Sequence, residues 1–155
     1  GTAYYYDYVQ SKKVQVNLSD VSKETKKTIN GVKAGSMVFG YTDQGAQICT
    51  TYNVFENGKA YVGCRTGEFQ ETIGPARYQV GGYIADTTQL EAAVKTADGF
   101  SEGEVARLNG KKVKIKAIFE NGYALVESAS VLSKLDTSSI LLKTSVSIVT
   151  TKDLQ

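Results

Sequence analysis

Two cysteines carry the most reactive side chains of this sequence, and both stand in its first half. Cys49 and Cys64 flank the stretch FENG (residues 55–58), and the chain contains no histidine. Two thiolates without histidine provide at most half of a zinc site, and no imidazole is present to activate a catalytic cysteine. The cysteines therefore predict either a disulfide or two buried thiols that pack as small apolar residues.

The remaining side chains give little support to catalysis. Without histidine the chain lacks the commonest general base and any Ser-His-Asp arrangement. Glu68, Glu71 and Asp86 are near one another in sequence, but no spacing pairs them. The glycines of GGYIAD (81–86) precede a strand pattern, whereas a phosphate loop opens a helix. We therefore expect no enzyme, no cofactor and no metal.

Charge also limits the partners. The net charge is +2, from 18 basic and 16 acidic residues, which is too balanced to indicate nucleic acid. Lys112, Lys114 and Lys116 share one strand face, which is typical of a solvated or edge strand and would otherwise suit a polyanion. No apolar run approaches the roughly 18 residues of a membrane span, so none is predicted.

The elements that position these residues are written twice. FENGKAYVGC (55–64) returns as FENGYALVES (119–128), 64 residues later, and the same shift aligns YIADTTQL (83–90) with SIVTTKDL (147–154). Two matching blocks at one offset indicate a tandem repeat. The second copy carries valine and serine where the first has its cysteines, so both cysteines are lost together, as residues in contact would be.

Each copy has the pattern of β-structure. Val113, Ile115, Ala117 and Phe119 alternate with lysines, which is typical of a half-buried strand, and Asn-Gly then favours a hairpin turn. If the first copy follows the same alternation, Cys49 faces the core. An apolar outer face then results, made of Ile48, Thr50, Tyr52 and Val54.

Further elements complete the pattern. Both TTQL and TTKDL predict a single helical turn opened by threonine, and KVQVNL (13–18) predicts the first strand of the first copy. Residues 19–31 predict a short helix that ends at Gly31. Residues 92–96 fit either a strand or the end of a linking helix. The start of the chain, TAYYYDYV, fits a strand, a linker or a tail.

Long insertions occur at the same point of both copies, at residues 65–81 and 128–145. Loops of this length are often functional, and arginine beside aromatic rings suits sugar or peptide recognition. The alternative is a loop that folds back to enlarge a small core. The recognition residues of the first insertion are Arg65, Phe69, Arg77 and Tyr78.

This arrangement resembles the bacterial SH3-like family. The resemblance rests on NGKAYV (57–62), GGYIADTTQL (81–90), NGKKVKI (109–115) and NGYALV (121–126). It implies an all-β fold of two tandem SH3-like small barrels with long loop insertions and one or two short helices. The expected division is an N-terminal segment (1–12), a first repeat (13–91) and a second repeat (92–155).

The resemblance implies a non-catalytic binding module of an exported bacterial or phage-associated protein, extracellular or in the cell envelope. Its ligand would be a cell-wall peptide or glycan, or a protein partner. The first copy is richer in tyrosine, so we expect the ligand there, on Tyr52, Tyr61 and Tyr83 together with the first insertion. The alternative is a structural subunit of an envelope, secretion or virion assembly.

Overall fold

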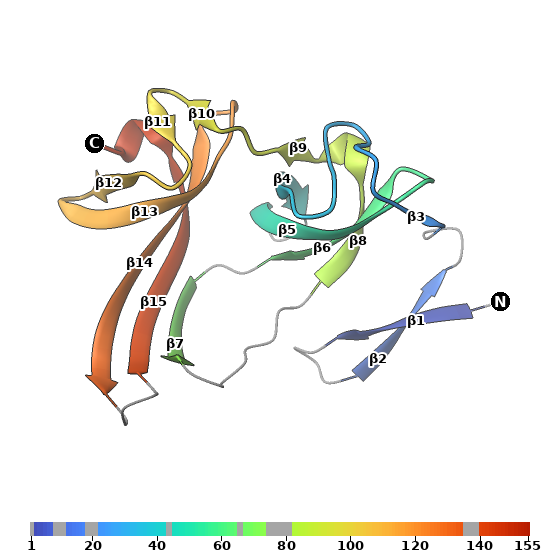
Figure 1. The fold of residues 1–155 in the computed structure, drawn as a ribbon, viewed down its shortest axis with the longest axis horizontal. Helices are drawn as coiled ribbons and strands as arrows, with labels where there is room; N and C mark the ends of the chain where they lie inside the picture. Colours follow the sequence, from blue (N-terminus) through green and yellow to red (C-terminus); the bar gives the residue numbers. More distant parts are fainter. Residues whose placement is uncertain are drawn as a thin grey trace. The chain divides into compact units, whose positions relative to one another are not determined.

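In the part of the chain that the structure describes, every element is a β-strand, a turn or a single turn of 3₁₀ helix (Figure 1). The structure is a computed structural model and describes residues 2–7, 12–17, 22–42, 45–64, 67–73, 82–134 and 140–155. The predicted all-β class is confirmed. The chain divides into two compact units: unit 1 is Gly1–Arg65 with Gln79–Ala93, and unit 2 is Thr66–Tyr78 with Val94–Gln155.

Unit 1 is built on one antiparallel sheet of strand order β8-β6-β5-β4-β9, with β3 (Glu24–Thr25) paired to β5. Four strands form a meander, a 3₁₀ turn follows, and the last strand pairs back onto the first strand of the meander. The bounds are β4 (Met37–Thr42), β5 (Gly45–Phe55), β6 (Lys59–Cys64), β8 (Gly82–Asp86), η1 (Thr87–Gln89) and β9 (Glu91–Ala92).

Unit 2 follows the same path. Its sheet has the order β12-β13-β14-β15-β7, and after the 3₁₀ turn Gln155 exchanges both backbone hydrogen bonds with Arg107 of β12. The bounds are β7 (Gly67–Ile73), β10 (Thr96–Ala97), β11 (Phe100–Ser101), β12 (Val105–Leu108), β13 (Lys111–Ile118), β14 (Tyr123–Lys134), β15 (Ile140–Thr150) and η2 (Thr151–Asp153). Both predicted threonine-led helical turns are present. The assignment to SH3-like barrels stays a prediction.

The N-terminal part differs from the expected division. The strand predicted at 13–18 exists as β2 (Lys12–Asn17), but it pairs with β1 (Thr2–Asp7) in a separate two-stranded sheet. The tyrosine-rich start is therefore a strand. The main sheet of unit 1 begins later in the chain, with β3.

The helix predicted over 19–31 is wrong for its described part, residues 22–31. Ile29 and Val32 pair across a two-residue turn, in which Asn30 and Gly31 both take positive φ (51° and 79°). The glycine that was expected to end a helix instead closes a hairpin of the type that Asn-Gly favours. Residues 92–96 form no helix either; they contain the end of β9 and the start of β10.

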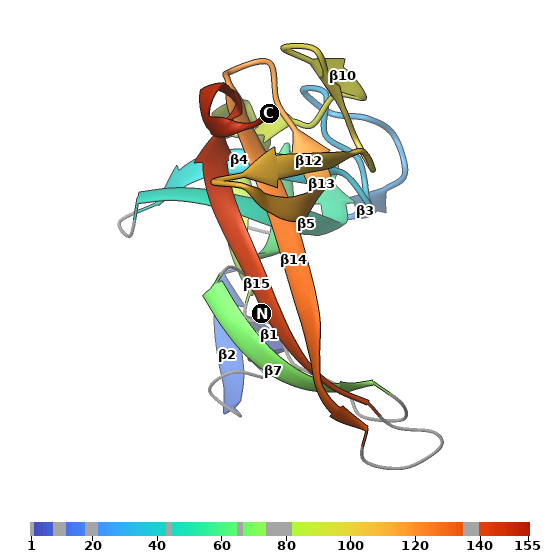
Figure 2. The same ribbon diagram turned by 90° about the vertical axis from the view of Figure 1, so that its left-hand side faces the viewer.

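The parts of the insertions that the structure describes are strands rather than loops. Residues 67–73 form β7, which pairs with β15 of unit 2, with Val146 opposite Gly67 and Ile140 opposite Ile73. The second insertion lengthens the β14–β15 hairpin, and β7 lies beside this hairpin in both views (Figures 1 and 2). A segment that interrupts the first repeat thus belongs to unit 2.

A β-bulge at the same place in both units changes which residues face the core. Tyr52 is the extra residue of β5 and Lys116 that of β13. An extra residue reverses the inside–outside alternation beyond it. Val54 and Ile118 are therefore fully buried members of the two cores, and the expectation that Val54 lies on an outer face is wrong.

The repeated FENG stretch forms the turn that joins the bulged strand to the next strand, β5 to β6 in unit 1 and β13 to β14 in unit 2. Gly58 takes a φ of 85° and donates its N–H to the Phe55 carbonyl, while the Asn57 side chain accepts the Lys59 N–H. The second copy repeats each contact at Gly122 and Asn121. Only the glycine has positive φ, so the asparagine serves as a side-chain acceptor rather than as a left-handed residue.

A buried threonine joins this turn to the Asn30–Gly31 turn. Thr87, the first residue of η1, donates its hydroxyl to the Gly58 carbonyl (2.6 Å) and accepts a hydrogen bond from the Asn30 amide (3.0 Å). Its own N–H also donates to Gly58 (3.0 Å). One side chain therefore fixes two turns that lie far apart in sequence.

Unit 2 keeps this arrangement with one change. Thr151 takes the place of Thr87, and Asp98, also at positive φ, takes the place of Asn30. A carboxylate can only accept, and the hydroxyl has one proton to donate. Accordingly the Thr151 oxygen lies 2.7 Å from the Asp98 carboxylate and 3.3 Å from the Gly122 carbonyl.

We predict that Thr87→Val lowers the free energy of unfolding of unit 1 by about 1–3 kcal/mol, because the valine fills the same buried position but loses the hydroxyl's hydrogen bonds to Gly58 and from Asn30. Urea denaturation, followed by amide NMR signals of each unit, measures the change. Thr28→Val is the control, since Thr28 is exposed. Equal stabilities of the two variants would contradict the role given to Thr87.

Asp86 caps η1 and makes the stability of unit 1 depend on pH. Its carboxylate accepts the backbone N–H and the hydroxyl of Thr88 (3.0 and 2.7 Å), and Lys59 lies 3.7 Å away. The Thr88 hydrogen bonds, foremost, and the Lys59 charge lower the pKa of Asp86 from its ordinary 3.8. The ionised carboxylate thus stabilises the fold above the ordinary pKa, and this contribution is lost as the pH falls through the lowered one.

We predict that Asp86→Asn, which keeps an oxygen acceptor at the cap, is less stable than the wild type at neutral pH. The gap should close as the pH falls below 3.8 and the wild-type carboxylate becomes protonated. Urea denaturation at several pH values measures it. A gap that stays constant at all pH values would show that the charge of Asp86 has no part in stability.

Candidate functional site

The cysteines of unit 1 form a disulfide at one end of its core. Cys49 and Cys64 lie directly opposite each other on β5 and β6, with their Cα atoms 4.0 Å apart, and are bonded. Cys49 is buried within the core cluster, and Cys64 packs against that cluster. The two sulfur atoms therefore fill this end of the core between the two strands.

Tyr83 packs beside this disulfide. It lies opposite Val62 on the neighbouring strand, and its side chain contacts the same core cluster as Cys64. Partial burial raises the pKa of its hydroxyl. A disulfide and a tyrosine thus occupy the end of the unit 1 core.

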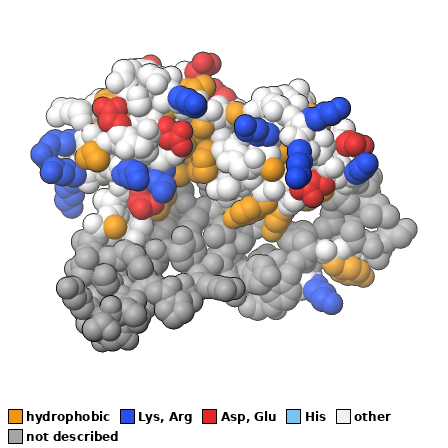
Figure 3. Space-filling view, in the orientation of Figure 1, with side chains coloured by type: hydrophobic (Ala, Val, Ile, Leu, Met, Phe, Trp, Pro, Cys, Tyr) orange, Lys and Arg blue, Asp and Glu red, His pale blue; other side chains and the backbone are white. Residues whose placement is uncertain are grey.

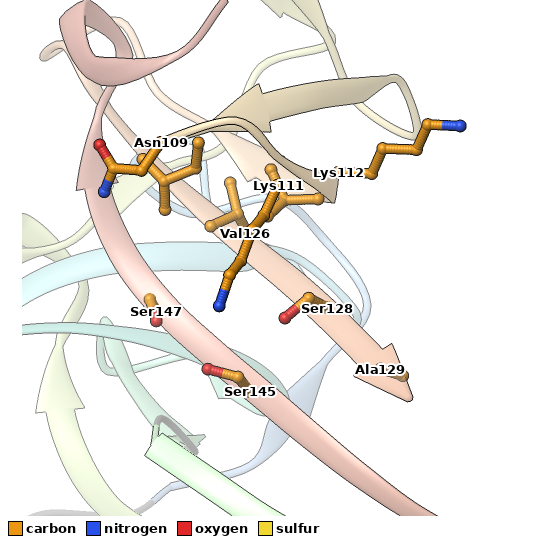
Figure 4. Close-up of a pocket in the computed structure, with 10 residues that line it drawn as sticks. Asn109, Lys111, Lys112, Val126, Ser128, Ala129, Ser145 and Ser147 are labelled. Atoms are coloured by element: carbon orange, nitrogen blue, oxygen red, sulfur yellow. The ribbon is translucent and has the colours of Figure 1, made fainter. Parts of the chain in front are cut away.

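The same positions of unit 2 line a pocket with a volume of about 470 Å³. Its walls come from β12, β13, β14 and β15, and Figure 4 shows its side chains. We call it the serine pocket. Its lining residues are Leu108, Asn109, Lys111, Lys112, Val113, Val126, Ser128, Ala129, Ser145 and Ser147.

The serine pocket exists because the core-facing rows of three strands change from apolar to polar at this end. Alternate residues of a strand share a face. On β14 the row passes from buried Val126 to half-buried Ser128, and on β13 from buried Val113 to exposed Lys111. On β15 the row passes from Val149, which packs against the core, to half-buried Ser147. Serine side chains are too small to fill the space that core residues would occupy.

Comparison of the two repeats shows a coordinated exchange at these positions. The shift of 64 residues places Cys49 on Val113, Cys64 on Ser128 and Tyr83 on Ser147. Gln47 falls on Lys111 by the same shift. Where unit 1 has Cys64, Tyr83 and Gln47, unit 2 therefore has two serine hydroxyl groups and a positive charge.

The electrostatic character of the serine pocket is basic. Its lining contains two lysines and no carboxylate. The Lys111 ammonium points into the space between Ser128, Ser145 and Ser147, whereas Lys112 points away (Figure 4). Lysine and arginine side chains also gather on the surface at the left of Figure 3, where Figure 1 shows β12 and β13.

The lysines predicted to share a strand face are separated by the bulge. Lys112 and Lys114 are exposed, and Lys116 lies 3.7 Å from Glu127. Because β13 lies between β12 and β14, the interpretation of these lysines as protection of a sheet edge is wrong.

The tyrosines proposed as a ligand site do not converge. Tyr52 and Tyr61 lie on the outer face of the unit 1 sheet, with ring centroids 5.7 Å apart, while Tyr83 packs on the core side. Each outer ring covers a glycine. A Cβ atom added at Gly63 would lie 2.5 Å from the Tyr52 ring, and one added at Gly82 would lie 2.7 Å from the Tyr61 ring. The two outer rings therefore cover sheet backbone, and Tyr52 remains 43% exposed.

The first insertion is placed only in part. Phe69 lies on β7 with its backbone opposite Thr144, and its side chain is outside the described residues. Arg65, Arg77 and Tyr78 also lie outside the described residues.

The serine pocket was not predicted from the sequence, although the repeat contained its signal. The offset that aligned FENG with FENG also aligned both cysteines and Tyr83 with small or hydroxyl-bearing residues. Ser128 and Ser145 were instead assigned to a loop insertion, and Ser147 to the block that matches residues 83–90. A second missed signal is TINGVKAG (28–35) against TADGFSEG (96–103), shifted by 68 residues, which encodes the turn that the buried threonine holds.

No protein-family model, no curated protein and no solved structure matches this chain significantly. Within the described residues, no helix has the length and apolar character needed to cross a membrane. The described residues also contain no cluster of three or more His, Cys, Asp or Glu side chains placed to hold a metal ion.

We predict that the double variant Cys49→Val, Cys64→Ser, which copies the residues of unit 2, folds but loses about 3 kcal/mol of unfolding free energy. The disulfide closes a loop between residues 15 apart, and loops of this size restrict the unfolded chain by about that amount. Urea denaturation with and without dithiothreitol measures it. The wild type should lose a similar amount on reduction and the variant should not respond. A variant as stable as the oxidised wild type would contradict the prediction.

Proposed function

We propose that this protein is a non-catalytic binding protein whose ligand occupies the serine pocket of unit 2. The observation that carries the proposal is the exchange between the repeats: the same scaffold is filled by a disulfide and Tyr83 in unit 1 and left open in unit 2. A volume of about 470 Å³ lies within the usual range for ligand pockets. Unit 1 then has the structural role and unit 2 the recognition role.

The chemistry of the lining supports binding rather than catalysis. A serine nucleophile needs a base within hydrogen-bonding reach. Among the described contacts no hydrogen bond joins Lys111 to Ser128, Ser145 or Ser147, and Lys111 is exposed. Hydroxyl groups that both donate and accept, set beside an apolar wall, suit the polar groups of a peptide or sugar.

We further propose that the ligand is a cell-wall peptide or glycan and that the protein is exported from a bacterium. The resemblance in the repeated motifs supports this, as does the disulfide, because such bonds persist in oxidising compartments outside the cytosol. The proposal moves the binding residues from the tyrosines of unit 1 to unit 2.

We predict that Ser147→Tyr, which places the unit 1 residue in unit 2, lowers binding to purified bacterial sacculi at least about tenfold. The tyrosine should fill the pocket as Tyr83 fills the matching place in unit 1. A pull-down measures the bound fraction, and the NMR spectrum establishes that the variant is folded. The double variant Tyr52→Ala, Tyr61→Ala is the control and should bind as the wild type does.

Two outcomes would count against the proposal. A folded Ser147→Tyr variant that binds sacculi normally would show that the serine pocket is not the site. Failure of the wild type to bind sacculi would remove the cell wall as the target. The structural-subunit alternative would then become the better description, and the partner would be sought in an assembly.

A further inference from the structure

We infer that the serine pocket recognises a carboxylate group carried on a short aliphatic body, as at the free end of a peptide of small residues. The inference deepens the proposed function by naming the chemical class of the ligand, and it rests on the pocket being a binding site.

The charge of the serine pocket favours an anion. Lys111 directs its ammonium group into the pocket, and the lining residues contain no acidic side chain to neutralise it (Figure 4). The only carboxylate within ion-pair distance of a lysine on β13 is that of Glu127, among the described residues, and its partner is Lys116. An ammonium group without an acidic neighbour in a partly enclosed space favours an anionic ligand.

The hydrogen-bond donors of the serine pocket match a carboxylate. The Lys111 ammonium faces hydroxyl groups from two adjacent strands, Ser128 on β14 and Ser145 and Ser147 on β15. A carboxylate has two oxygens that accept several hydrogen bonds, and each hydroxyl can rotate to donate one. Lysine with convergent hydroxyl donors thus matches both the charge and the acceptor capacity of one carboxylate.

The serine pocket also has an apolar lining, which consists of Leu108, Val113 and Val126. Leu108 is half-buried and the two valines are almost fully buried. The volume of about 470 Å³ exceeds what a small inorganic anion fills. The pocket therefore fits an anion with an aliphatic body, which packs against the apolar lining, chiefly Leu108, while its carboxylate meets Lys111.

The repeat provides an internal comparison. At the four positions that supply these features, unit 1 has Gln47 for Lys111, Cys64 for Ser128, Gly81 for Ser145 and Tyr83 for Ser147. The ammonium group and the three serine hydroxyl groups are therefore specific to unit 2. A pocket left over from poor packing would have no reason to combine a charge with three hydroxyl groups.

The experiment titrates the full chain with N-acetyl-alanyl-alanine and, as the matched probe, its C-terminal amide, followed by ¹⁵N amide chemical shifts. The acid should shift the amide signals of Lys111, Ser128 and Ser147 and bind at least about tenfold more tightly than the amide. Lys111→Gln should weaken the binding of the acid about tenfold and leave the binding of the amide unchanged. Lys114→Gln removes the same charge from an exposed side chain of β13 that does not line the pocket, and it should leave the binding of both probes unchanged.

Several results would overturn the inference. Equal binding of acid and amide would exclude recognition of the carboxylate. An equal effect of Lys111→Gln and Lys114→Gln would indicate a diffuse positive field. Inorganic phosphate that binds as tightly as the acid would indicate a general anion site without a role for the apolar wall.

The result also separates this inference from the proposed function. If Ser147→Tyr abolishes sacculus binding but the acid and the amide bind with equal affinity, the proposed binding role of the pocket is retained and its specificity for a carboxylate is excluded. If the wild type does not bind sacculi but binds the acid more tightly than the amide, the specificity for a carboxylate is retained and the cell wall is excluded as the target.

Discussion

The hydroxyl group of one buried threonine in each unit hydrogen bonds to two turns, one made 29 residues earlier in the chain and the other more than fifty residues earlier. Asn30 and Thr87 are separated by 57 residues and Asp98 and Thr151 by 53, yet each pair is hydrogen bonded. The threonine also opens the 3₁₀ turn that directs the chain to its closing strand. The threonine contact therefore links the start, the middle and the end of each unit. The surrounding core makes this contact strong, because a buried polar group without a partner is costly.

The bulge in the second strand of each meander is a related constraint. It reverses the alternation just before the FENG turn and brings Val54 and Ile118 into the two cores. The displaced residue is free to differ, and it does: Tyr52 covers a glycine in unit 1, whereas Lys116 pairs with Glu127 in unit 2. The duplicated scaffold thus tolerates different outer faces while its turns and core stay the same.

The two units differ most where the core ends. In unit 1 a disulfide and Tyr83 close that end, which adds stability to a domain of small size. In unit 2 the same scaffold has serines and a lysine there, and it gives up apolar packing for a pocket. Buried apolar area stabilises a fold, so a core that ends in an open polar pocket is less stable. A ligand that occupies the pocket stabilises the folded state. The long β14–β15 hairpin and the added strand β7 give unit 2 further sheet pairing.

The sequence by itself determined the all-β class, the FENG hairpins and the two threonine-led helical turns, because these rest on local properties: strand alternation, turn chemistry and a repeat at constant offset. Only the tertiary structure decided the rest. The bulges were invisible, since one extra residue leaves the composition of a strand unchanged. Asn30 and Gly31 ended a plausible helix pattern in sequence, and only their long-range partner, Thr87, distinguishes a hairpin. The destination of β7 and the serine pocket likewise depend on which strands become neighbours, and the residues that line the pocket come from four strands that no local pattern brings together.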